Sequence, residues 1–171
     1  RYSSSAASDV YKRQVMAGCL PDHMPVVVAA VQAIVQDAFD LTEMQGTTHC
    51  TAPLTIVNGP ARQACCGISG GYGALGPGHR ANASIGRALR LAMMNIGGAR
   101  PGISDMALLG HPGKFTYCLA EDEENSPFEP LHVSLGYGEA ESVVTVVGAE
   151  APHSVMYLSL IHISEPTRLS V

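Results

Sequence analysis

The sequence predicts an α/β or α+β domain in which layered helices cover a small mixed sheet, and two observations point to this class. Helix-type and strand-type apolar patterns alternate along the chain, and the strand-type runs are short and rich in β-branched residues. Clusters of glycine and proline separate these runs, as expected where a chain turns between layers. The predicted order of elements is helix, strand, loop, helix, strand, strand.

The first predicted helix covers residues 24–39. Asp22 precedes Pro25, which is the order expected of an N-cap and an early helical proline. Apolar residues lie nearly all round this helix, so most of its sides should be buried. The valine-rich residues 25–31 leave a strand as the alternative for that part.

A buried strand is predicted over residues 53–58, because a short apolar run there is closed by Gly59 and Pro60. Residues 67–78 follow as a glycine-rich loop. Glycine reaches backbone conformations that other residues rarely adopt, so this loop is free to turn sharply.

The clearest helix follows the loop, because apolar residues recur at helical spacing over residues 85–96. Asn82 or Ser84 can cap its start, and the glycine pair at residues 97–98 ends it. The remaining predicted elements are a strand-like stretch at 115–120, an acidic loop at 121–130 and a strand at 143–147.

Both ends of the chain resemble translated sequencing adapters. Residues 4–14, SSAASDVYKRQ, and residues 158–168, LSLIHISEPTR, each match what one reading frame of such an adapter encodes. Segments of this origin are set aside before the fold is considered. We therefore expect one incomplete globular domain over residues 15–157, and no structure over residues 1–14 and 158–171.

The charge balance excludes a nucleic-acid partner. Residues 15–157 contain six Lys or Arg and thirteen Asp or Glu, so their formal net charge is −7, whereas that of the whole chain is −5. Binding to a phosphate backbone depends on clustered Lys and Arg, whereas Lys114 is the one lysine of this stretch. The longest apolar run, residues 26–31, is far shorter than the ~20 residues that a membrane span needs, so no membrane partner is expected.

The cysteines and histidines show no regular spacing. An odd number of cysteines with an adjacent pair, Cys65 and Cys66, is typical of reduced thiols and predicts a cytoplasmic protein. A signal peptide ahead of residue 15 is the alternative. The histidines lack the spacing of metal ligands, so the sequence offers no positive evidence for a zinc site, no metal ligands are assigned, and no cofactor is identified.

The glycine-rich loop is the first candidate binding site. Free N–H groups and the positive end of the following helix dipole can hold an anion or another polar group. The candidate binding residues lie in the loop and at the entry to the helix: Gly70, Gly71, Gly73, Gly78, Arg80 and Asn82. The alternative is that the glycines allow close packing between loop, helix and sheet.

Cys19, Glu121 and Glu124 are the candidate catalytic residues. Cys19 precedes a predicted helix start, where the dipole would acidify its thiol; a small buried apolar group is the commoner role of a free cysteine. Glu121 and Glu124 follow a predicted strand and can supply an acid or base, with a solvated loop as the alternative. Together these features predict an enzyme domain that acts on a small anionic or polar substrate.

Five segments of the chain resemble an uncharacterised bacterial family: MAGCLPDHMPVVVAAVQAI, TTHCTAPLTIVNGP, GPGHRANASIGRALRLAMMNIGG, PGKFTYCLAEDEENSPFEPLH and VVTVVGAEAPH. Some members are linked to UGSC-type (seleno)proteins. The resemblance therefore implies a redox (seleno)protein, or a missing domain of the same chain, as a partner. It also implies thiol redox chemistry. An accessory domain that packs on a redox protein is an alternative function. A further alternative, which follows from the cysteines and histidines, is a soft-metal-binding module in which Cys19 or Cys50 meets His49, His79 or His111. Asp122 and Phe128 stand where family members often show Asn and Trp.

Overall fold

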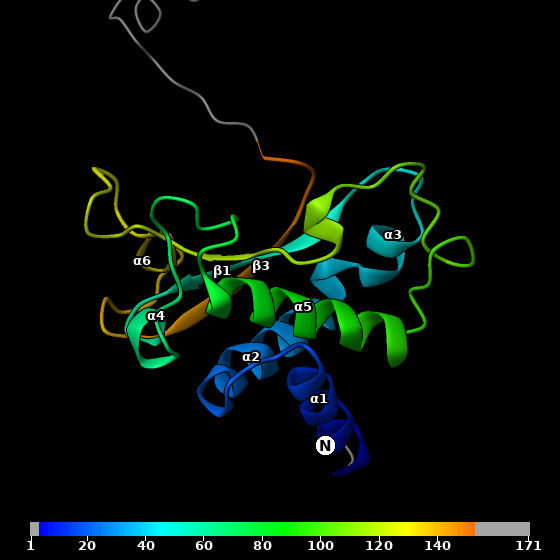
Figure 1. Cartoon of the computed structure of the whole chain (residues 1–171). Coiled ribbons are helices and arrows are strands. Elements are labelled where there is room, and N and C mark those ends of the chain that lie inside the picture. Colours follow the sequence, from blue (N-terminus) through cyan, green and yellow to red (C-terminus); the bar gives the residue numbers. More distant parts are fainter. Residues whose placement is uncertain (1–3, 153–171) are drawn as a thin grey trace, which may run out of the picture.

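Helices lie against one face of a three-stranded sheet (Figure 1). The structure is a computed structural model, and it describes residues 4–152. The strand order is β2-β1-β3. The central strand β1 (Ala52–Asn58) pairs in parallel with β2 (Cys118–Ala120) and antiparallel with β3 (Val143–Ala149). A small mixed sheet with layered helices is an α+β fold, which confirms the predicted class.

The strand register decides which side chains face the helices. Val57 lies beside Ala120 on one side and Val144 on the other, and paired residues point to the same face of a sheet. All three belong to, or pack against, the core cluster under the helices. Leu54 and Ile56 point the other way and are only half-buried, so the core lies between the sheet and one helical layer.

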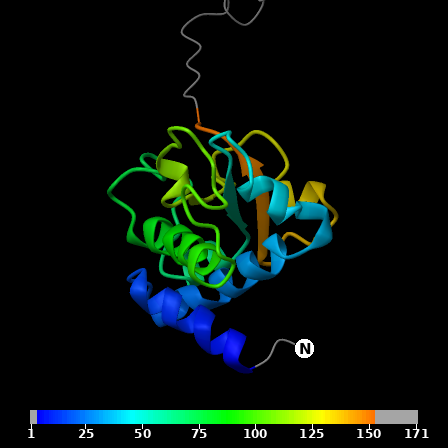
Figure 2. The ribbon, with the colours of Figure 1, turned by 90° about the vertical axis from the view of Figure 1, so that its right-hand side faces the viewer.

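That layer consists of α2 (Met24–Ile34) and α5 (Arg80–Asn95), and α1 (Ser4–Met16) lies outside it (Figure 2). The expectation of no structure over residues 1–14 is wrong for residues 4–14, which form most of α1. Val10 packs against the core cluster, so burial of an apolar side chain holds this helix in place. Residues 158–171, the other adapter-like segment, lie outside the described residues.

The first predicted helix is interrupted. α2 ends at Ile34, and a 3-10 turn at Asp37–Phe39 precedes the short helix α3 (Leu41–Gln45). The residue that precedes α2 is His23 rather than Asp22, and its side chain makes no capping hydrogen bond. Three preceding residues, Pro21–His23, form a 3-10 turn of their own.

The long helix α5 begins earlier than its expected caps. Asn82 and Ser84 lie inside the first turns of α5, and the preceding residue is His79. Both side chains bond to backbone outside the helix, which uses the polar groups that a cap would need. The buried face of α5, which includes Ile85 and Leu89, follows the predicted helical spacing.

Two short helices and two loops gather at the end of the sheet where β1 and β2 finish (Figure 1). The helices are α4 (Ala61–Ala64) and α6 (Leu131–Ser134). The loops are the glycine-rich residues 67–78 and the acidic residues 121–130. The second strand, β2, is shorter than predicted, because the N–H groups of Phe115 and Thr116 donate back to the carbonyl of Pro112 in the preceding 3-10 turn.

Within residues 4–152, no individual helix combines the length and apolar character that crossing a bilayer requires. One bent pair, Pro21–Ile34 with Asp37–Gln45 at 74°, meets the criteria of length and composition when its two parts are taken together.

Candidate functional site

The candidate site lies where the parallel strands β1 and β2 end. The register that places Val57 beside Ala120 also places the next two residues, Asn58 and Glu121, side by side. The backbone N–H of Glu121 continues the ladder by donating to the carbonyl of Val57 at 3.1 Å. Loops that follow the carboxyl ends of parallel strands are a common place for binding sites in open sheets.

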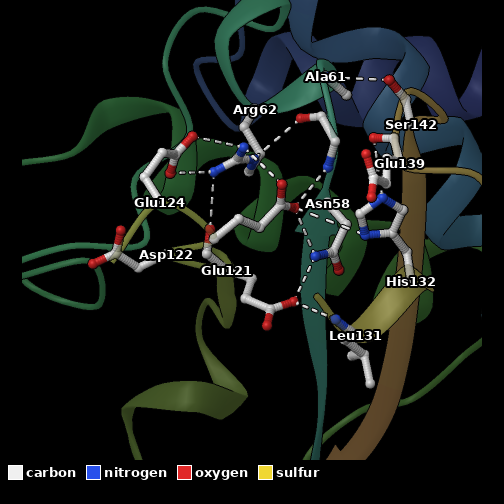
Figure 3. Close-up of polar contacts among 12 residues, drawn as sticks. Asn58, Ala61, Arg62, Glu121, Asp122, Glu124, Leu131, His132, Glu139 and Ser142 are labelled. Atoms are coloured by element: carbon white, nitrogen blue, oxygen red, sulfur yellow. Dashed lines mark hydrogen bonds and ion pairs between the residues drawn. The ribbon is translucent and has the colours of Figure 1, made fainter. Parts of the chain in front are cut away.

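Asn58 holds two carboxylates together (Figure 3). Its Nδ2 donates to Glu121 Oε2 at 2.6 Å and to Glu123 Oε1 at 2.8 Å. The backbone N–H of Gly59 donates to the same oxygen of Glu123, and that of Leu131 to Glu121 Oε2. Asn58 is fully buried, so these bonds form away from bulk water and fix both carboxylates firmly.

Arg62, from α4, supplies the positive charge of this cluster. Its Nη2 lies 2.8 Å from Glu123 Oε2, and Nη1 and Nη2 form a two-pronged pair with Glu124 at 2.8 Å each. The side chains of Arg62 and Glu123 are only 10% and 12% exposed. The hydrogen bonds between Arg62 and Glu124 raise the pKa of the guanidinium and lower the pKa of the carboxyl, so both stay ionised.

His132, from α6, completes the cluster. Its ring is 1% exposed, and its Nδ1 lies 3.9 Å from Glu123 Oε1, too far for a hydrogen bond. Among the described residues, eight buried side-chain nitrogen or oxygen atoms have no hydrogen-bond partner, and two of them, His132 Nδ1 and Asn58 Oδ1, lie in this cluster. Buried polar atoms are usually paired, and what distinguishes these two from the other six is their position beside two carboxylates, Glu121 and Glu123.

The glycine-rich loop packs directly on this edge. Ser69 accepts a hydrogen bond from the N–H of Ala120 at 3.0 Å. A Cβ atom on Gly70 would lie 2.5 Å from the carbonyl oxygen of Ala120 and 2.8 Å from the N–H nitrogen of Asp122. Close packing is therefore one established role of this loop, and a glycine at position 70 is what permits it.

Asn82 anchors the same loop. Its Oδ1 accepts from the N–H of Ser69 at 2.9 Å, and its Nδ2 donates to the carbonyls of Ser69 and Ala74. These bonds use both ends of the amide and leave it little capacity to bind a substrate. Gly71, Gly73 and Gly78 are exposed on the outer part of the loop.

Arg80 does not join the acidic cluster. Its Nε and Nη2 donate to the carbonyl of Gly18 at 3.3 and 2.9 Å, which ties the start of α5 to the segment before α2. The structure therefore brings together Glu121, Glu124 and Gly70 of the expected site. Arg80 and Cys19 lie in a separate neighbourhood.

The prediction that Cys19 is a thiolate is wrong, because its surroundings disfavour the ionised form. Burial raises the pKa of Cys19 to about 11, and the nearby charge of Arg80 lowers it less than burial raises it. Cys19 also precedes a 3-10 turn of three residues, and α2 begins only at Met24. A dipole effect fades within a turn, so nothing acidifies this thiol enough to ionise it at neutral pH.

Sequence reasoning missed four residues of the cluster: Asn58, Arg62, Glu123 and His132. The position of Asn58 could have been recognised from the sequence, because Asn58 is the polar residue at the end of the predicted strand 53–58. Glu121 likewise follows the end of the predicted strand 115–120. Had the two strands been taken as parallel neighbours, these residues would have been placed together. Nothing in the spacing of Arg62 and His132 indicates that they meet the acidic loop.

Within residues 4–152, no group of three His, Cys, Asp or Glu side chains is arranged to hold a metal ion.

The chain also has an apolar hollow of about 310 Å³ between α2 and α5, whose lining includes Val31, Met93 and Ile96. A hollow of about 30 Å³ lies beside the glycine-rich loop, lined by Leu75 and Asn82 among others.

Comparison with family models, with characterised proteins and with solved structures finds no match to this chain.

Proposed function

We propose that this domain belongs to an enzyme that binds a small polar molecule over the carboxyl ends of β1 and β2. The observation that carries the proposal is the pair of buried, unpaired atoms, Asn58 Oδ1 and His132 Nδ1, beside the carboxylates of Glu121 and Glu123. Burying a polar atom without a partner costs free energy, and binding sites are where such costs are commonly retained.

Glu121 is the acid or base of the proposed reaction. Asn58 and the N–H of Leu131 both bond to its Oε2, which fixes the carboxylate while Oε1 has no hydrogen-bond partner among the described residues. A proton-transferring group must be held in place in this way, with one atom left to reach the substrate. Glu124 instead positions Arg62, because both of its oxygens are used by the guanidinium.

A second candidate function is an accessory domain that packs on a redox (seleno)protein or on another domain of the same chain. The observation that favours it is a segment with exposed apolar side chains, of which Ile103, Leu108 and Leu109 are 76%, 92% and 98% exposed. Exposed apolar groups that lie close together are typical of surfaces that bind another protein. We also propose that the domain works in the cytoplasm, because its cysteines are free thiols.

Glu121→Gln tests the proposed enzyme site. The substitution removes the charge and keeps an oxygen that can accept from Leu131 and Asn58, so the fold should survive. A library of small polar metabolites is screened by ligand-observed NMR. We expect a molecule that binds the native protein and binds Glu121→Gln roughly tenfold more weakly, the loss of one charge-assisted hydrogen bond.

The matched control is Glu129→Gln, which makes the same change at an exposed position of the same loop. It should bind as the native protein does. If every molecule found by the screen bound Glu121→Gln as tightly as the native protein, the proposed site would be wrong.

A further inference from the structure

The hydrogen-bond donors of the acidic cluster are already in use. The three guanidinium nitrogens of Arg62 all bond to carbonyl or carboxylate oxygens of Gly59, Glu121, Glu123 and Glu124. Asn58 Nδ2 donates to two carboxylates, and the N–H groups of Gly59 and Leu131 donate to one each. Among the described residues, an anionic ligand could use these donors of Arg62, Asn58, Gly59 and Leu131 only by displacing an oxygen that already accepts from them.

Acceptors, by contrast, are left over. Asn58 Oδ1 is buried without a partner, and Oε1 of Glu121 makes no hydrogen bond among the described residues. His132 Nδ1 is a further buried ring nitrogen with no hydrogen-bond partner among residues 4–152. It is an acceptor in the tautomer in which Nε2 donates to the carbonyl of Glu139, which lies 3.4 Å away. A ligand that satisfies these atoms must bring N–H or O–H groups of its own.

The net negative charge of the cluster also favours a ligand that brings hydrogen-bond donors. Glu121, Asp122, Glu123 and Glu124 are four carboxylates, and Arg62 is the one guanidinium that lies among them. One positive and four negative side chains give a formal charge of −3, with His132 not counted. A buried or half-buried carboxylate is stabilised by a cation that donates hydrogen bonds to it.

We infer that the molecule bound at this edge carries a positive charge and N–H donors, as a protonated amine or a guanidinium does. The inference rests on the proposed function, because it names the class of substrate for that same site. It replaces the anion that the glycine-rich loop suggests, since the amide of Asn82 bonds to backbone groups at both ends and Nε and Nη2 of Arg80 donate to the carbonyl of Gly18.

The test compares small probes of opposite charge. 1,3-Diaminopropane and agmatine are titrated against the native protein, with acetate and inorganic phosphate as anionic probes and erythritol as a neutral one. Binding is followed by NMR through the Asn58 side-chain amide and the His132 ring. We expect the two amines to move both sets of resonances, and the other probes to leave them in place.

The variants and the salt dependence decide whether charge is the cause. Glu121→Gln should weaken amine binding at least tenfold, and Glu129→Gln should not change it. Should Glu121→Gln fail to fold, salt provides a second measurement, because sodium chloride raised from 0.05 to 0.5 M should weaken binding of a cation to the native protein.

The two proposals can fail separately. If phosphate, acetate or erythritol moved the Asn58 and His132 resonances and the amines did not, the charge of the substrate would be wrong and the site would stand. Amines that bind Glu121→Gln as tightly as the native protein, or that bind nowhere on it, would also overturn the charge inference. The metabolite screen tests the site itself, whatever the charge of the molecules it finds.

Discussion

At the scale of single residues, Cys19 shows how burial outweighs a neighbouring charge. Arg80 lies close enough to favour the thiolate, yet burial disfavours it more, and the pKa rises to about 11. A thiol with this pKa is a poor nucleophile at neutral pH, because the thiolate is the form that attacks. Chemistry at the carboxyl end of β1 and β2 is therefore expected to depend on carboxylates rather than on this thiol.

Alkylation kinetics measure this directly. We predict that iodoacetamide modifies Cys19 at pH 7 roughly a hundredfold more slowly than an unstructured cysteine peptide, whose pKa is about 8.5. Above pH 9 the peptide rate levels off, while the rate at Cys19 should keep rising about tenfold per pH unit. Mass spectrometry of the modified peptides gives both rates. Faster modification of Cys19 than of the peptide at pH 7 would restore the thiolate as a candidate.

At the scale of elements, the glycine-rich loop and the end of β2 are fitted to each other. The atoms nearest to a Cβ on Gly70 belong to the backbone of Ala120, Glu121 and Asp122, which cannot move without moving the site. The neighbouring Gly71 has open space in the same position. Alanine substitutions at these two adjacent positions can therefore be compared, because both add a methyl group and only the one at residue 70 disturbs a close contact.

We predict that Gly70→Ala lowers the free energy of unfolding by about 1–3 kcal/mol, the usual cost of overpacking a tight contact. It should also weaken binding of whichever molecule the metabolite screen identifies, because Glu121 must shift. Gly71→Ala should leave both unchanged. Urea unfolding and ligand titration measure the two effects, and equal values for the two variants would mean that the loop is not seated on β2 as described.

At the scale of the whole molecule, the sequence predicted the parts that depend on local pattern. The helical spacing of residues 85–96 and the apolar run of residues 53–58 are local, and α5 and β1 confirm them. The site depends instead on long-range pairing. Asn58 meets Glu121 only because β1 and β2 pair in parallel, and residues 58 and 132 are 74 positions apart, so no local pattern brings His132 to them.

Helix ends were predicted less well for a related reason. Asn82 and Ser84 have the chemistry of caps, but tertiary partners use their polar groups: Ser69 and Ala74 for Asn82, and the carbonyl of Gly18 for Ser84. Intrinsic preference is a weak guide where distant backbone competes for the same side chain.

Asp105 joins separate parts of the molecule. Its Oδ2 pairs with Arg90 of α5 at 2.6 Å, and its Oδ1 pairs with Lys114 at 2.9 Å. Arg90 also donates to Gln45 of α3, so one buried network connects α3, α5 and the segment before β2. Burial pushes the pKa of Asp105 up, but the hydrogen bonds from Lys114 and Arg90 together hold it below its ordinary value.

A carboxyl whose pKa is lower in the folded protein stabilises the fold above its unfolded pKa of about 3.9, and this contribution is lost as the pH falls through the folded pKa. We predict that Asp105→Asn lowers the free energy of unfolding at pH 7 by about 3 kcal/mol, because the buried Arg90 loses the carboxylate that pairs with it. The difference should shrink below pH 4. Urea unfolding between pH 3 and 7 measures it, with the exposed Asp37→Asn as the control. A variant as stable as the native protein at pH 7 would show that this network does not hold the three elements together.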